Sequence, residues 1–112
     1  MSQITTHILD TSTGKPAAEV ETSLEQRKDG VWNEIAHGRT DSDGRIGDLL
    51  SPDITLPAGV FRLIFHTGNY FSAQGKKCFY PRVVIIFETT DESHYHVPLL
   101  LNPFGYSTYR GS

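Results

Sequence analysis

The sequence lacks the features of a disulfide scaffold, a membrane protein or a polyanion binder. Its single cysteine, Cys78, excludes an intrachain disulfide framework and is compatible with a reducing compartment. Its longest apolar run, residues 83–87, is far shorter than the roughly 20 residues that a membrane-spanning helix needs. Charged residues make up 21% of the chain and the formal net charge is -3, so we expect no nucleic-acid or membrane partner.

Targeting signals are also missing from this sequence. Residues 1–6 contain neither a basic region nor an apolar stretch, and the chain does not end in Ser-Lys-Leu. We therefore expect a cytoplasmic location by default. With 112 residues, the chain is expected to form one domain over residues 1–112 and to bury roughly 60–70% of its unfolded surface.

Short β-rich runs alternate with clusters of turn-forming residues, which is typical of an all-β chain. Residues 19–28 alternate between two faces like a half-buried strand, and Asp29-Gly30 predicts a hairpin turn after them. The continuous apolar run at 83–87 predicts a strand that is buried on both faces. The expected strands cover residues 4–9, 19–28, 31–39, 59–67, 82–88, 93–101 and 105–111, with a loop at 10–16 and a loop or short edge strand at 46–57.

The remaining segments complete this all-β interpretation. Residues 68–77 are expected to contain one short helix. Asn102-Pro103-Phe104-Gly105 has proline second and glycine fourth, as a type I turn prefers. About eight short strands at regular spacing predict a two-sheet β-sandwich.

One acidic stretch resembles part of a calcium-binding loop without completing it. Asp41, Asp43 and Gly44 have the spacing of such a loop. However, Arg39 stands where the first carboxylate belongs, and Leu50 stands where the bidentate glutamate belongs. We expect no metal there.

Three segments carry side chains suited to chemistry. His7 lies in the middle of an expected strand, on the face that it shares with Thr5. Arg45 follows a tight turn, where its guanidinium could hold a planar anion through two hydrogen bonds. His94 and His96 share one strand face, and this spacing could bind a metal, share a proton or fill an interface. Each segment alone also has an ordinary structural interpretation.

The chain ends in Tyr109-Arg110-Gly111-Ser112, which combines an aromatic ring, a guanidinium, a flexible glycine and a hydroxyl. A free terminus usually frays, so this composition suggests that the end is held in place and belongs to a site. The alternative is an ordinary polar tail after a closing strand.

Taken together, these segments resemble those of the transthyretin-related proteins and, within that family, the 5-hydroxyisourate hydrolases. Transthyretin itself lacks the tetrapeptide ending and the histidine set of the enzymes, so the chain is more similar to the enzymes. The resemblance runs nearly end to end. It rests on Thr6-His7-Ile8-Leu9-Asp10, Gly14-Lys15-Pro16-Ala17, Thr40-Asp41 with Gly44-Arg45, His94-Tyr95-His96-Val97-Pro98-Leu99-Leu100 and Gly105-Tyr106-Ser107-Thr108-Tyr109-Arg110-Gly111-Ser112.

This resemblance implies a transthyretin-like two-sheet β-sandwich that assembles as a homotetramer, a dimer of dimers with active sites in the channel between dimers. It implies an enzyme of purine catabolism that hydrolyses the cyclic amide of 5-hydroxyisourate to 2-oxo-4-hydroxy-4-carboxy-5-ureidoimidazoline in urate degradation. The implied substrate is a small purine-derived molecule. No cofactor is implied.

The family's functional positions that match here are His7, Arg45, His96 and the terminal tetrapeptide. Either His7 or His96 could act as general base while the other orients it or returns the proton. Arg45 would hold the substrate anion and stabilise developing negative charge. Ser112 would add a hydroxyl and the terminal carboxylate, and strand alternation would turn Arg110 away from the face of Tyr109 and Gly111. The expected catalytic residues are His7, Arg45, His96 and Ser112, and the expected substrate-binding residues add Tyr109, Arg110 and Gly111.

Two alternatives remain at this point. A carrier of small aromatic ligands could use the same sandwich, because a fold does not dictate a function. A metal site could use His94, His96 and His7, although no Cys, Asp or Glu stands at ligand spacing. His37 and His66 are left without an assigned role.

Overall fold

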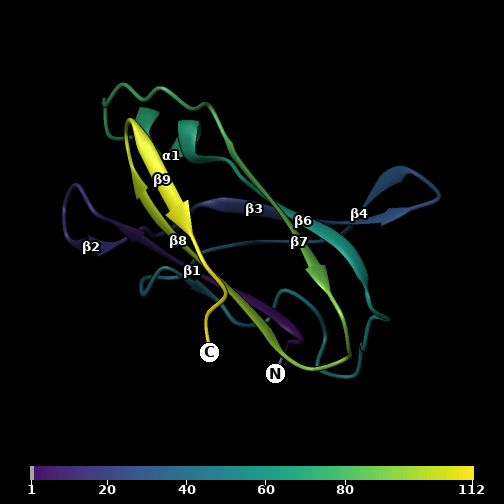
Figure 1. The fold of residues 1–112 in the computed structure, drawn as a ribbon. Helices are drawn as coiled ribbons and strands as arrows, with labels where there is room; N and C mark the ends of the chain where they lie inside the picture. Colours follow the sequence, from purple (N-terminus) through teal and green to yellow (C-terminus); the bar gives the residue numbers. More distant parts are fainter. Residues whose placement is uncertain (1) are drawn as a thin grey trace.

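The structure of the chain, a computed structural model, describes residues 2–112 as two β-sheets packed over a common core with one short helix (Figure 1). This confirms the predicted two-sheet sandwich. One sheet has the order β2 (Lys15–Pro16), β1 (Ile4–Asp10), β8 (Tyr95–Asn102) and β9 (Gly105–Thr108), and β5 (Arg45–Ile46) also pairs with β1. The other sheet has the order β4 (Val31–Arg39), β3 (Glu21–Lys28), β6 (Gly59–Phe65) and β7 (Val83–Thr89).

The first sheet is organised around the parallel pairing of β1 with β8. The other pairings in both sheets are antiparallel. In the β1–β8 register Thr5 lies opposite His96 and His7 lies opposite Pro98, while on the other side of β1 His7 lies opposite Arg45 of β5. Residues from the start, middle and end of the chain therefore meet on neighbouring strands.

The two faces of this sheet have different surroundings. Ile4 and Ile8 of β1, and Val97 and Leu99 of β8, belong to the buried core between the sheets. Since side chains alternate along a strand, Thr5, His7 and His96 must point to the outer face. Hydrophobic burial thus orients the polar side chains of β1 and β8 away from the core.

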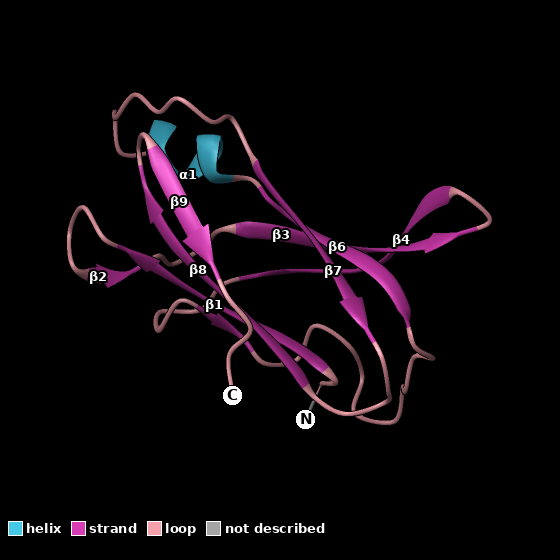
Figure 2. Cartoon of the chain, viewed as in Figure 1, coloured by secondary structure: helices cyan, strands magenta, loops and turns pink. Residues whose placement is uncertain are grey.

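The predicted hairpin between residues 19–28 and 31–39 is confirmed as β3 and β4. Both turn residues have positive φ, 53° for Asp29 and 75° for Gly30, as a two-residue type I′ turn requires. The predicted helix is present as α1 (Thr67–Ser72), at the end of the sandwich opposite the chain termini (Figure 2). In residues 2–112 no helix is long and apolar enough to cross a membrane.

The prediction that the run 83–87 is buried on both faces is wrong. The run lies in β7, the last strand of its sheet, and only alternate residues such as Val83 and Ile85 belong to the core. Ile86 points away from the core and is 61% exposed. A continuous apolar run is typical of a strand covered on both sides, but nothing in a single chain covers this outer face.

The segments predicted at 10–16 and 105–111 also differ from the structure. The expected loop at 10–16 contains the short strand β2, which folds back so that Pro16 pairs with Leu9. The last strand, expected to reach residue 111, ends at Thr108. Beyond it a single antiparallel bridge joins Gly111 to His96. The tail therefore continues the register of β9 without forming a regular strand.

The carboxylate of Asp10 joins the end of β1 to α1. It accepts hydrogen bonds from the backbone and hydroxyl of Ser12 and, at 2.8 Å, from the hydroxyl of Tyr70. Burial raises the pKa of Asp10, but these hydrogen bonds outweigh burial and hold the pKa below its ordinary value. Asp10 therefore acts as a structural anion at the end of the strand that carries Thr5 and His7.

Candidate active site

Polar side chains from three strands and the chain end meet on the outer face of the first sheet. Thr5 comes from β1, Arg45 from β5 and His96 from β8. Together with Ser112 and their neighbours they surround a hollow of about 310 Å³. Small-molecule sites commonly begin at this volume, so the hollow suits a ligand the size of a single purine. The residues that line it are Thr5, Thr6, Arg45, Ile46, Gly47, His94, His96 and Ser112.

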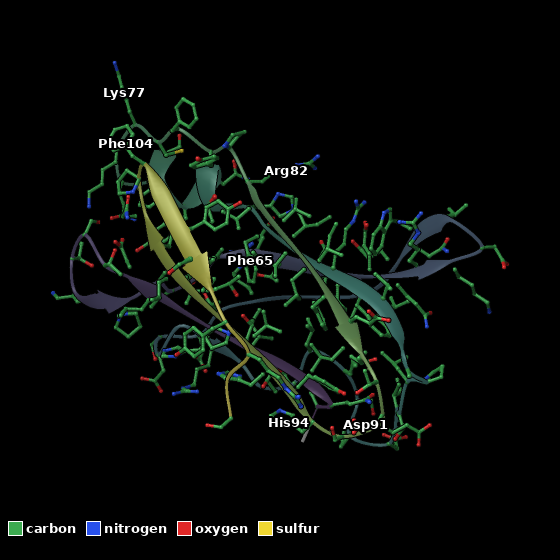
Figure 3. The ribbon with its side chains drawn as sticks, viewed as in Figure 1. Phe65, Lys77, Arg82, Asp91, His94 and Phe104 are labelled. Atoms are coloured by element: carbon green, nitrogen blue, oxygen red, sulfur yellow. The ribbon has the colours of Figure 1, made fainter. Side chains whose placement is uncertain are left out.

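Two imidazoles are bridged by one hydroxyl at this hollow. Oγ1 of Thr5 lies 2.7 Å from Nδ1 of His96 and 3.0 Å from Nε2 of His94. The two rings are stacked, with centroids 6.5 Å apart and planes inclined by 22°. The prediction that both histidines share one face is confirmed, and Figure 3 shows His94 beside the end of the chain. Sequence reasoning did not single out Thr5, because its importance depends on the register between β1 and β8.

The C-terminal tail is attached to the strand that carries His96. The backbone N–H of Gly111 donates to the carbonyl of His96 at 2.8 Å. A Cβ atom on Gly111 would lie only 2.6 Å from Cδ2 of His96 and 3.1 Å from Cγ of Pro98. Glycine is therefore needed for the tail to lie against the imidazole, and the following residue, Ser112, reaches the hollow.

His7 is adjacent to the hollow rather than part of its lining. Its position opposite Arg45 in the β1–β5 register brings its imidazole near that of His96, on whose ionisation it acts electrostatically. The structure thus brings His7, Arg45, His96 and Ser112 into one neighbourhood, as the resemblance implied.

Tyr109 and Arg110 lie around a second hollow, between β7 and β8, which His96 also lines. Arg110 places its guanidinium carbon 4.4 Å from the centre of the Tyr95 ring. It also helps to lower the pKa of Asp91 to about 2, although hydrogen bonds from Ser93 and Tyr95 are the larger causes. Within one chain these two side chains therefore do not line the hollow that contains Ser112.

The surroundings of His96 favour its neutral form. Burial is the main cause that lowers its pKa below the ordinary value of 6.5, and repulsion from Arg45, and from His7 and His94 when they are protonated, lowers it further. A neutral imidazole at neutral pH has one nitrogen that can accept a proton. His96 is therefore suited to proton transfer at the hollow.

The other candidates from the sequence lie elsewhere or lack support. His37 is exposed and lies 3.5 Å from Glu34, and His66 precedes α1 on the other sheet's side. In the described part of the chain, no three His, Cys, Asp or Glu side chains are placed to hold a metal ion together. The alternative metal site thus gains no geometric support, and the site contains no preformed set of ligands.

The fold and the site together define a transthyretin-like β-sandwich with a polar hollow on the outer face of one sheet. The chain belongs to the HIUase/Transthyretin family, whose model matches residues 4–111.

Known relatives include 5-hydroxyisourate hydrolases and transthyretins. The chain is 48% identical to a 5-hydroxyisourate hydrolase of Salmonella typhimurium, over 97% of this chain and 80% of the relative. It is 43% identical to a probable 5-hydroxyisourate hydrolase of Caenorhabditis elegans, over 99% of this chain and 82% of the relative. Among solved structures, the 5-hydroxyisourate hydrolase of Klebsiella pneumoniae has a TM-score of 0.87 and 39% identity, covering 97% of this chain and 98% of that chain.

Transthyretin from Sparus aurata has a TM-score of 0.92 and 36% identity, covering 99% of this chain and 97% of that chain. Backbone similarity alone therefore does not separate a 5-hydroxyisourate hydrolase from a transthyretin here. The distinction has to come from the side chains at the hollow.

The fit of the tail against His96 can be tested by Gly111→Ala. The added methyl must displace the imidazole, the proline or the tail, and overpacking of this kind costs about 1–3 kcal/mol. We expect a lower free energy of unfolding in urea and shifted NMR signals of the His96 ring. Gly59→Ala is the control, since its Cβ would meet only one atom, at 3.9 Å. An unaltered His96 ring in Gly111→Ala would contradict the contact.

The charge effect on His96 can be tested by Arg45→Gln. Because Arg45 lowers the pKa of His96, removing its charge should raise that pKa toward 6.5. His96 would then become cationic at a higher pH than in the wild type, which an NMR titration of its ring proton measures. Arg39→Gln, which removes an exposed arginine paired with Glu21 instead, should leave the titration unchanged. A pKa of His96 that stays the same or falls in Arg45→Gln would refute this account.

Proposed function

We propose that this protein is a 5-hydroxyisourate hydrolase of urate degradation. It hydrolyses the cyclic amide of 5-hydroxyisourate to 2-oxo-4-hydroxy-4-carboxy-5-ureidoimidazoline and requires no cofactor. The observation that carries the proposal is the convergence of a neutral imidazole, an arginine and the chain end at one hollow of purine size. Relatives named 5-hydroxyisourate hydrolase, up to 48% identical over nearly the whole chain, support the same activity.

The reaction needs a base for water and an acid for the leaving nitrogen. Water attacks a ring carbonyl, a carbon–oxygen bond forms, the carbon–nitrogen bond of the cyclic amide breaks, and the freed nitrogen takes a proton. His96 is suited to accept the proton of the attacking water, because its pKa is lowered and it lines the hollow. His7 lies opposite Arg45 in the β1–β5 register. It is the second imidazole, which could orient the water or return the proton.

Arg45 and Ser112 are proposed to bind and polarise the substrate. A guanidinium is always charged and can hold a planar anion through two parallel hydrogen bonds. The same charge stabilises the oxyanion that forms when water attacks the carbonyl. Ser112, which also lines the hollow, is proposed to contribute its hydroxyl.

We propose that residues 1–112 act as a single hydrolase domain in a cytoplasmic homotetramer, a dimer of dimers. Exposed apolar side chains on the β7 edge and beyond β9 support this assembly, with Ile86 at 61% and Tyr109 at 59% exposure. In such a tetramer Tyr109 and Arg110 of one chain could approach a site that they do not reach within their own chain. Sedimentation should give a particle of four times the 12.5 kDa chain mass, and a stable monomer would contradict the assembly.

A carrier of small aromatic ligands is the second candidate. The observation that favours it is the TM-score of 0.91 to sea bream transthyretin in complex with thyroxine. A carrier should keep its affinity for an iodinated aromatic ligand after His96→Asn. The hydrolase should lose turnover instead.

The activity is tested by making 5-hydroxyisourate with urate oxidase in the cuvette and following its ultraviolet decay. Wild type should accelerate the decay, while His96→Asn and a chain that ends at Thr108 should each lose about a hundredfold or more, as expected when a general base or a binding element is removed. His37→Asn is the matched control, because this exposed histidine lies far from the hollow. Wild-type decay at the spontaneous rate would reject the hydrolase and favour the carrier.

A further inference from the structure

Thr5 forms hydrogen bonds with His94 and His96, and the proposed mechanism does not define which group donates in each of them. A hydroxyl has a single proton, so Thr5 cannot donate to both imidazoles. If Thr5 donates to Nδ1 of His96, then Nε2 of His96 carries the ring proton. If Nδ1 of His96 donates to Thr5, then Nε2 of His96 keeps its lone pair, and the Thr5 hydroxyl can donate to an unprotonated Nε2 of His94.

Only the second arrangement makes His96 a base toward the hollow. Its Nδ1 atom is engaged with Thr5, so Nε2 is the nitrogen left for substrate or water. Within residues 2–112, Nε2 of His96 forms no hydrogen bond. The tautomer of His96 thus decides whether this atom accepts or donates a proton.

We propose that Thr5 is a positioning residue which, together with neutral His94, holds His96 in the tautomer with its proton on Nδ1. This inference rests on the proposed hydrolase function and assigns a part to His94, which the mechanism does not otherwise use. Thr5 is only 8% exposed, so water competes little for its hydroxyl. The bridge distances of 2.7 Å to His96 and 3.0 Å to His94 are both within hydrogen-bond range, so the one hydroxyl links the two imidazoles.

Protonation of His94 would break this arrangement. A cationic imidazole only donates, so Thr5 would accept from His94 and its hydroxyl proton would lose the acceptor on that ring. The groups around the pair are His7 from β1, Arg45 from β5, Ser112, and Glu92, which shares a small hollow with His94. The charge of Arg45, and that of His7 when it is protonated, favours the neutral form of His96.

The test is a long-range ¹H–¹⁵N NMR experiment on protein labelled at histidine, at a pH above the pKa of His96. Wild type should show the His96 proton on Nδ1. Thr5→Val removes the hydroxyl at nearly constant volume, so the proton should move to Nε2, and kcat should fall at least about tenfold with KM within about threefold. Thr5→Ser restores the hydroxyl, so it should restore both the His96 proton on Nδ1 and the wild-type kcat.

Two further variants separate this role from general damage. His94→Ala changes an exposed residue and removes the acceptor of Thr5, so it should also shift the His96 proton to Nε2. Thr22→Val removes a buried hydroxyl from β3 in the other sheet and should change neither the tautomer nor kcat. The proposal would be overturned if the His96 ring proton were on Nε2 in the wild type. It would also be overturned if this proton stayed on Nδ1 in Thr5→Val or His94→Ala. The spectra do not depend on turnover, so a failed hydrolase assay would be distinguishable from a failed tautomer assignment.

Discussion

The parallel pairing of β1 with β8 is the constraint on which the site depends. It joins segments about ninety residues apart and places Thr5 directly opposite His96. Such a non-local pairing carries a cost in chain entropy, which the burial of Ile8 and Leu99 between the sheets offsets. The same burial fixes the register, because a shift by one residue would turn the polar side chains into the core. The geometry of the imidazoles therefore follows from the packing behind them.

The other pieces of the site are added to this pair of strands. On one side, the short strand β5 carries Arg45 to a position opposite His7. On the other side, the chain end returns beside β8, where Gly111 bonds to the backbone of His96. The positive charge of Arg45 and the partial burial of the ring then lower the pKa of His96. Strand pairing thus holds Arg45 and His96, and a single backbone bridge holds the residue before Ser112.

Relatives of this fold show how a common backbone can serve different functions. A hydrolase and a transthyretin both superpose on this chain with TM-scores of 0.87 or more. The side chains on the inner face of each sheet pack in the core. Side chains on the outer face can therefore change without loss of the fold. In this chain that face carries imidazoles, a guanidinium and an ordered terminus, which suit acid–base chemistry better than the binding of an apolar ligand.

The sequence by itself determined the sandwich, the β3–β4 hairpin and the residue types of the site, because alternation, turn chemistry and motifs are local properties. It misjudged the run in β7, since a local pattern does not show whether anything covers the outer face of a sheet, and Ile86 on that face is exposed. Tertiary structure alone decided that Thr5 bridges His94 and His96 and that Arg110 stacks on Tyr95 instead of lining the hollow. These contacts depend on strand register between distant segments, and register is set by the packing of the whole core rather than by neighbouring residues.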